Sequence, residues 1–445
     1  MSSPVAALLA ERRGRGDAGR PMPLGLTIAL AVTLATFYAS SAYETPLTTF
    51  LISAKWGPLG GLAVIAWITF RSLPRRPAMP LPVVIPLAMF VLLAAFSSIG
   101  GVDPGRSLTA LAAIVGTLVC GYLVSAVVVA TDSRQAFFDL IATLARVVMA
   151  VSSLFLITGI SLGRGATQGL SAWTDNPNTL AAIVAPGAVI FFAGCLARER
   201  GWEYRHAPFF AISVLLILAS SSRASMAWLL ISMAAFWIYR RGLAINSLVA
   251  MAVAVLVLLE WQTISTYLID TLGLSGRINV GNTPLSGREE VWRLGWDLFL
   301  QRPAFGYGID TSTELILAEA WRLVRHQGAH FHSSYLATLV ETGFAGFVAL
   351  MAALTLTVVR GLGDSDRTRA LPGNRWMLSA LPWAMFLGAS GHALFESWLI
   401  YSGNVNMLLF WTLVWLIHHQ TQIAVRPVAA RPPSPGTAEI ALRAR

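Results

Sequence analysis

The chain has 445 residues, of which 56% are hydrophobic and only 12% are charged. Soluble domains are roughly 45–50% apolar and about 25% charged, so this composition argues against a soluble enzyme. The apolar residues fall in long runs, many near the ~20 residues that cross a bilayer as a helix. We therefore predict an all-α polytopic membrane protein. The meaning of the formal net charge of +10 depends on which segments of the chain carry the basic residues.

Residues 1–21 carry several arginines and no apolar core, so they predict an N-terminal tail before the first span. About twelve transmembrane helices follow, nine within residues 22–260 and three within residues 335–417. The expected spans are residues 22–41, 58–70, 80–99, 108–130, 136–160, 179–197, 207–221, 224–239, 244–260, 335–359, 376–394 and 405–417. Residues 418–445, rich in Pro, Arg and Ala, predict a disordered tail.

The distribution of arginine sets the expected sidedness. Lys and Arg are retained on the cytoplasmic side of membrane proteins. If the N-terminus is cytoplasmic, most of the 32 basic residues lie in cytoplasmic segments. Both termini are then cytoplasmic. The one long connection, residues 261–334 between spans nine and ten, is then periplasmic and is where we expect chemistry.

This periplasmic segment contains a predicted helix over residues 287–301. Ser286-Gly-Arg-Glu has the form of a capping box, and the apolar residues that follow repeat at helical spacing. Trp292 and Trp296 suit the lipid headgroup level, so we expect this helix to lie on the outer membrane surface. Arg288 in its first turn, beside free backbone amides, resembles an anion site.

Titratable residues gather where the chain re-enters the membrane. His330 and His332 stand just before span ten, and Glu341, Gly343 and Gly346 lie inside it. An ionisable residue within a span is a functional candidate, and the glycines are expected to permit close helix packing. Acidic and basic residues nearly balance over residues 261–334, which excludes the broad basic surface that nucleic-acid binding needs.

These residues carry a family resemblance. His332-Ser333, nine residues, Gly343, two residues and Gly346 satisfy the pattern H-[NSQ]-x9-G-x-x-[GTY] of bacterial O-antigen ligases. Further motifs occur in the order of that family: residues 176–181 at a span start, Ser222-Arg223 at a turn, residues 286–288 before a helix, and Pro303 with Gly306-x-Gly308. The chain resembles the O-antigen ligase and polymerase superfamily over roughly residues 176–347.

The resemblance implies a type C glycosyltransferase fold and a lipid-linked glycan as the substrate. Such enzymes transfer a glycan from undecaprenyl diphosphate at the periplasmic face of the bacterial inner membrane, without cofactor or metal. Arg223 and Arg288 match the arginine motifs of the family and are expected to bind the diphosphate. His332 is expected to be the general base that deprotonates the attacking sugar hydroxyl, with inversion at the anomeric carbon.

Each of these residues also has a structural interpretation. Arg223 would then anchor a turn at the interface, Arg288 would be a solvated helix residue, and His332 would cap span ten. The pair His330-x-His332 has metal-binding spacing, but no third ligand is evident, so we expect no metal. Glu341 is either a hydrogen-bonding partner between helices or a substrate contact.

Other candidates lie outside this segment. His392 and Glu396 share a helix face at the outer end of span eleven, so they are candidates for substrate binding together with His330. Asn178 either binds sugar or caps span six.

Three functions remain open from the sequence. The first is a ligase that transfers the glycan to the lipid A core, and the second is an O-antigen or exopolysaccharide polymerase that joins lipid-linked repeat units. The third is a polysaccharide or lipid transporter. It is disfavoured because transporters place charged sites near the midplane, whereas the polar residues here gather at the outer face.

Overall fold

The computed structural model describes residues 20–160, 162, 169–197, 202–241, 260, 263, 266–267, 271, 288–323, 330–368, 375–401 and 403–424. Over these residues the chain is helical, and the extended contacts are limited to an isolated bridge between Ala42 and Thr174. The expected all-α fold is therefore confirmed for the part of the chain that is described.

A helix is present at each predicted span except the ninth, residues 244–260, nearly all of which lies outside the described residues. The helices are α2 (Leu24–Ala39), α3 (Pro46–Ala54), α4 (Trp56–Ser72), α5 (Leu81–Ile99), α6 (Pro104–Ala130), α7 (Arg134–Thr158), α8 (Pro177–Cys195), α9 (Trp202–Ala219), α10 (Arg223–Arg241), α13 (Arg288–Gln301), α14 (Ser312–Ala318), the 3-10 helix η3 (Ala320–Arg322), α15 (Ser334–Thr368), α16 (Arg375–His392) and α17 (Val405–Ala424).

Several boundaries differ from the prediction; α15, for example, continues to Thr368, beyond the expected residue 359. The short helix α3 was not expected; it begins because Thr45 accepts a hydrogen bond from the Thr48 amide at 3.1 Å and Pro46 favours the first helical position. At the other end, α17 continues to Ala424, beyond residue 417 where the disordered tail was predicted to start. His418 and His419 are buried there, and their rings contact Thr357 and Ser125.

Six segments among the described residues are long and apolar enough to cross a membrane. They are residues Pro46–Ser72, Leu81–Ile99, Pro104–Ala130, Arg134–Thr158, Pro177–Cys195 and Ser334–Ser365. The outward face of α5 indicates a lipid environment most clearly, because its apolar residues Ile85, Leu92 and Phe96 are each more than half exposed. Such a continuous apolar stripe is stable against lipid rather than water. The count of twelve crossings and their sidedness stay predictions.

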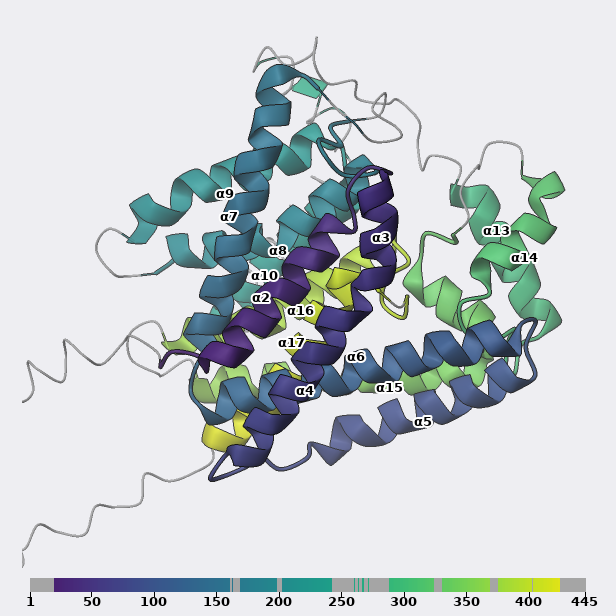
Figure 1. Ribbon diagram of the computed structural model, residues 1–445, viewed down its shortest axis with the longest axis horizontal. Coiled ribbons are helices and arrows are strands. Elements are labelled where there is room, and N and C mark those ends of the chain that lie inside the picture. The colour runs from purple at the N-terminus through teal and green to yellow at the C-terminus, as the bar shows by residue number, and fades with distance from the viewer. Residues whose placement is uncertain are drawn as a thin grey trace, which may run out of the picture.

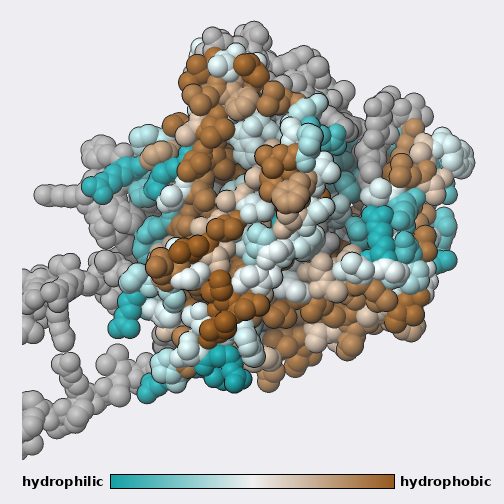
Figure 2. All heavy atoms as spheres, viewed as in Figure 1, coloured by the Kyte–Doolittle hydropathy of each residue, from teal (hydrophilic) through white to brown (hydrophobic). Residues whose placement is uncertain are grey.

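The helices place the polar elements at one end of the bundle. In Figure 1, α5, α6 and α15 run side by side, and α13 and α14 lie at their right-hand end. Figure 2 shows hydrophobic side chains over α5 and hydrophilic ones near α13 and α14. Helices α10 and α16 are antiparallel, because Ser225 contacts His392 and Ser232 donates to the Ala384 carbonyl. The start of α10 and the end of α16 therefore lie together.

Helix α15 is broken at Gly343, whose φ of 65° and ψ of −173° are not helical. In an unbroken helix the amides of Phe344 and Ala345 would bond to the carbonyls of Val340 and Glu341. Here these amides instead donate to the carbonyls of Pro303 and Ala304, at 2.7 and 3.3 Å.

The carbonyls of Val340 and Glu341, which the break leaves without helical partners, accept hydrogen bonds from the segment between α13 and α14. Tyr307 N donates to Val340 O at 3.1 Å, and Gly308 N donates to Glu341 O at 2.9 Å. Ser97 on α5 donates to Glu341 O as well. Residues 303–308 thus insert into the break, and the close packing expected of Gly343 is contact with the backbone of this loop, not with a second helix.

We predict that Gly343→Ala destabilises the fold by at least about 3 kcal/mol, because a positive φ is strained for alanine and its Cβ has no space. That Cβ would lie 2.4 Å from backbone atoms of Ala304 and Phe305. Thermal unfolding of the purified protein in detergent measures the effect.

Gly363 is the matched control, since it lies in the same helix and a Cβ there meets nothing within 4 Å. Gly363→Ala should leave the melting temperature unchanged or raise it slightly. Equal melting temperatures for the two variants would contradict the role given to the break.

Candidate functional site

The start of α15 is attached to the loop that follows α16. The Ser334 hydroxyl donates to the Glu396 carbonyl at 2.6 Å and accepts from the amides of Trp398 and Leu399 at 3.0 and 3.1 Å. Next to it, the Ser333 amide donates to the Ser397 hydroxyl at 3.0 Å. These contacts fix the backbone just after His332 against residues 396–399.

His332 has a left-handed backbone conformation, with a φ of 48°, which costs a non-glycine residue roughly 1–2 kcal/mol. It is not the cap of α15: the Ser333 hydroxyl accepts the Leu336 amide at 3.3 Å. The imidazole faces the loop instead, with Nδ1 at 3.6 Å from Glu396 Oε2. Its side chain is 26% exposed, so the ring is accessible.

Glu396 also holds Arg288, the first residue of α13. Arg288 Nη2 lies 2.8 Å from Glu396 Oε1, and Nη1 donates to the Phe395 carbonyl at 2.8 Å. With its side chain only 15% exposed, Arg288 is not a solvated helix residue. Burial alone would raise the pKa of Glu396, but the contact with His332 and the charges of Arg288 and His332 lower it to about 2. The carboxylate is therefore ionised at neutral pH.

His392 and Arg223 lie at the same end of the bundle. His392 is fully buried, its Nδ1 accepts from Trp398 Nε1 at 2.7 Å, and Nε2 is 3.4 Å from the Ser225 hydroxyl. It therefore supports the loop rather than facing a substrate. Arg223 is the first residue of α10, two positions before Ser225, and its side chain is half-buried.

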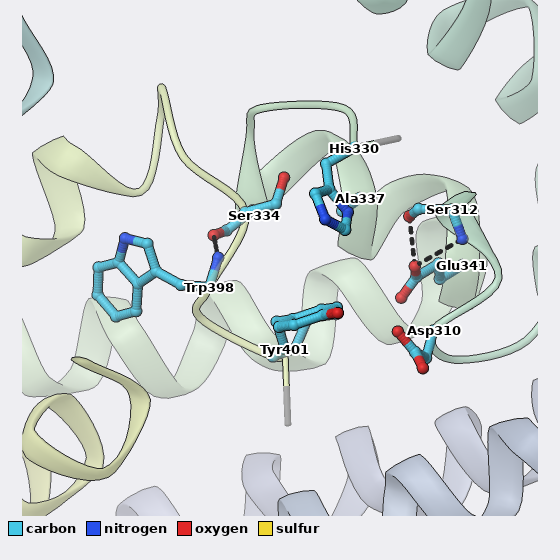
Figure 3. Close-up of a pocket in the computed structure, with 10 residues that line it drawn as sticks. Asp310, Ser312, His330, Ser334, Ala337, Glu341, Trp398 and Tyr401 are labelled. Atoms are coloured by element: carbon cyan, nitrogen blue, oxygen red, sulfur yellow. Dashed lines mark hydrogen bonds between the residues drawn. The ribbon is translucent and has the colours of Figure 1, made fainter. Parts of the chain in front are cut away.

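His330 and Glu341 belong to a neighbouring cavity. It is lined by Asp310, Ser312, His330, Ser334, Ala337, Glu341, Ser397, Trp398, Ile400 and Tyr401, most of them labelled in Figure 3. One oxygen of Glu341 accepts hydrogen bonds from both the hydroxyl and the amide of Ser312. His330 packs against Tyr401 with ring centroids 5.3 Å apart, so His330 and His332 contact different groups.

The predicted apolar face of α13 is confirmed. Val291, Leu294, Gly295, Leu298 and Phe299 are all buried. They pack with residues of α14 and α15 and with Phe331, so this face is covered by protein, and the position of the helix on the outer membrane surface stays a prediction. Trp292 donates to the Phe331 carbonyl at 2.9 Å, whereas Trp296 is 51% exposed. The capping motif at residues 286–287 lies outside the described residues.

Asn178 is not brought into this site by the contacts of the described residues. The cap of α8 is Asn176, whose side chain accepts the Thr179 amide at 2.9 Å. Asn178 is half-buried in the first turn of α8. Neither expected role, sugar binding or capping, gains support.

The sequence interpretation missed Arg106, Asp310 and Tyr401. Arg106, near the start of α6, contacts Asp310 at 3.1 Å and Glu314 at 2.8 Å. The sequence carried one signal for it, because arginine is scarce in the predicted outer loops. No sequence pattern indicates Tyr401, because its position at the cavity depends on the irregular loop that follows α16. Lys55 anchors that loop, donating from Nζ to the Gly403 carbonyl at 2.8 Å.

Comparison with known families finds one matching family over part of the chain. Residues 208–351, about a third of the chain, match the family described as O-antigen ligase, which confirms the resemblance to the O-antigen ligase superfamily. The matched region contains Arg223, Arg288 and His332, whereas Glu396 and Tyr401 lie beyond it. No curated protein matches the chain. The match supports, at a coarse level, a glycosyltransferase-like membrane enzyme that acts on lipid-linked glycans in lipopolysaccharide biosynthesis.

Proposed function

We propose that the protein is an inverting glycosyltransferase of the O-antigen ligase type. It transfers a glycan from undecaprenyl diphosphate to a sugar hydroxyl of the lipid A core, at the periplasmic face of the inner membrane. The observation that carries the proposal is the single carboxylate of Glu396, which contacts both Arg288 and His332. Glu396 thereby holds Arg288, the expected ligand of the diphosphate, beside His332, the expected base.

His332 serves as the general base in this proposal. With a proton on Nδ1, directed to Glu396, Nε2 is the nitrogen that accepts the proton of the attacking hydroxyl. The adjacent carboxylate also stabilises the imidazolium that forms. Glu396 is a positioning residue, because it acts through His332 and Arg288.

Arg288 and Arg223 neutralise the leaving diphosphate. Two of the donors of Arg288 are used by Glu396 and Phe395, and a guanidinium has five N–H groups, so donors remain for phosphate oxygens. Arg223 stands at the start of α10, where the backbone amides and the helix dipole favour an anion.

The reaction balances without a further reagent. The hydroxyl oxygen forms a bond to the anomeric carbon while the bond from that carbon to the diphosphate oxygen breaks. The proton goes to His332, and undecaprenyl diphosphate leaves as a stable anion. Because the leaving group needs no protonation, the arginines suffice for charge stabilisation, and the proposed mechanism is metal-independent.

We predict that His332→Ala lowers glycan transfer at least about 100-fold, the lower range for loss of a general base. The assay combines purified protein, undecaprenyl-diphosphate glycan and lipid A core in detergent, with the product measured by gel shift. An unchanged melting temperature shows that the variant is folded. Transfer at the wild-type rate by His332→Ala would contradict the assignment of the base.

Glu396→Gln distinguishes positioning from simple structural support. Glu396→Gln should lower kcat, because it removes the charge that stabilises the imidazolium formed at His332 during the reaction, and Glu396→Asp, which keeps a carboxylate, should restore part of the rate. Equal rates for the two variants, with unchanged melting temperatures, would assign Glu396 a structural role only.

We further predict that Arg288→Ala raises the KM for the lipid-linked donor and lowers kcat, because its charge contacts the leaving group. Arg293, on the same helix and exposed, is the matched control, and Arg293→Ala should change neither. Equal effects of the two substitutions would show that α13 contributes general surface charge rather than a specific phosphate contact.

A further inference from the structure

A charged side chain lies within the apolar helix α7. Arg146 stands near the middle of this helix, in a segment that is long and apolar enough to cross a membrane. A charged residue in such a segment is costly and commonly marks a functional contact. Figure 1 shows α7, α8 and α9 side by side and away from α13 and α14, which border the site described above.

Two aromatic rings flank the guanidinium of Arg146. Its Cζ lies 5.3 Å from the ring centroid of Phe191 on α8 and 5.1 Å from that of Phe209 on α9, which is within the range of cation–π attraction. The rings offer no oxygen acceptor, whereas a guanidinium carries five N–H donors. Over the residues that the structure describes, no hydrogen bond or ion pair uses these donors. The half-buried side chain therefore has donors for a ligand.

Asp139, the acidic residue of α7, does not neutralise Arg146. The two residues lie two helical turns apart, a rise of about 10 Å, and Asp139 accepts a hydrogen bond from Gln135 at 3.1 Å. Only a longer-range attraction connects Asp139 to Arg146. The positive charge of Arg146 is thus left for another anion.

A second arginine belongs to the same surface. Arg205 precedes Phe209 by four residues, so both lie on one side of α9, and this side faces Arg146. Arg205 is exposed. His206 lies within electrostatic range of both arginines, and its ring centroid is 6.1 Å from that of Phe191. Two cations from different helices therefore approach one place.

These side chains lie at the ends of α8 and α9 that are remote from the proposed active site. Phe191 is about one turn from the last residue of α8, and Arg205 is about one turn from the first residue of α9. The other end of α9, at Ala219, leads into Arg223. About 20 Å of helix separates Arg205 from that end. The sidedness expected from the arginine distribution places Arg205 at the cytoplasmic leaflet.

The exposed surface of α7 next to Arg146 suits acyl chains. Val147, Val151 and Leu154 recur at helical spacing and are 59%, 40% and 63% exposed. They form an apolar stripe that begins beside Arg146. Basic groups between transmembrane helices on the cytoplasmic side bind the headgroups of anionic lipids. A soluble anion would use the charge of the arginines but not this stripe.

We propose that Arg146 and Arg205 bind the phosphate of an anionic phospholipid in the cytoplasmic leaflet, and that the acyl chains of this lipid pack along α7. The phosphate oxygens supply the acceptors that the rings of Phe191 and Phe209 lack. The bound lipid thereby joins α7 to α9. This inference does not depend on the proposed glycosyltransferase function.

Native mass spectrometry of the full-length protein in detergent tests the site directly. The probes are dioleoyl phosphatidylglycerol, which is anionic, and dioleoyl phosphatidylethanolamine, which has the same chains and no net charge. The wild-type protein should bind the anionic lipid more tightly. Arg146→Gln should weaken this binding about fivefold, the effect of about 1 kcal/mol for one arginine near the membrane surface. Arg205→Gln, at an exposed position, should weaken it too, and it tests the site even if Arg146→Gln does not fold.

Arg71→Gln is the matched control. Arg71 also lies over an aromatic ring, that of Trp67 at 5.6 Å, at the expected cytoplasmic end of α4. Its substitution should leave binding unchanged. Equal affinity of the wild-type protein for the two lipids, or equal losses in Arg71→Gln and Arg146→Gln, would overturn the proposal.

Inorganic phosphate distinguishes a lipid site from a site for a soluble anion. At a concentration equal to that of phosphatidylglycerol, inorganic phosphate should displace almost none of the bound lipid, because it makes no contact with the apolar stripe of α7. Displacement of half of the lipid or more under this condition would contradict the lipid assignment.

Discussion

Between Val340 and Ala345 the backbone of α15 bonds to residues 303–308 instead of to itself. Four backbone hydrogen bonds are exchanged at the break, so the buried polar groups stay paired although the helix is interrupted at Gly343. The exchange fixes the connection between α13 and α14 against the first turns of α15. Arg288 at the start of α13 and His332 before α15 are thereby carried by elements that cannot shift independently.

A second constraint acts from the opposite side, through the loop between α16 and α17. Ser334 attaches this loop to α15, and Lys55 attaches it near the start of α4. Glu396 consequently reaches both Arg288 and His332 from a third element. The strained backbone of His332 is held by these contacts, which is typical of functional positions where neighbouring structure compensates a local cost.

The sequence predicted the parts of this arrangement that depend on local pattern. The five buried positions of α13 follow from helical spacing, and Arg288 and His332 follow from the motifs that carry the resemblance. For Gly343 the sequence predicts only close packing, because an apolar run gives no sign that its helix is broken. The pairing of Arg288 with Glu396 and the position of Tyr401 depend on contacts between distant segments and on an irregular loop, for which the sequence has no periodic signal.

In the proposed reaction, Arg288, His332 and Glu396 support formation of a glycosidic bond while the bond from the glycan to a lipid diphosphate breaks. Both products can be followed with purified protein supplied with undecaprenyl-diphosphate glycan and lipid A core: undecaprenyl diphosphate by mass spectrometry and the new anomeric linkage by NMR. We predict that one undecaprenyl diphosphate is released per glycan transferred, with inverted anomeric configuration. Retained configuration, release of undecaprenyl monophosphate, or movement of the lipid-linked glycan across a membrane without bond formation would contradict it.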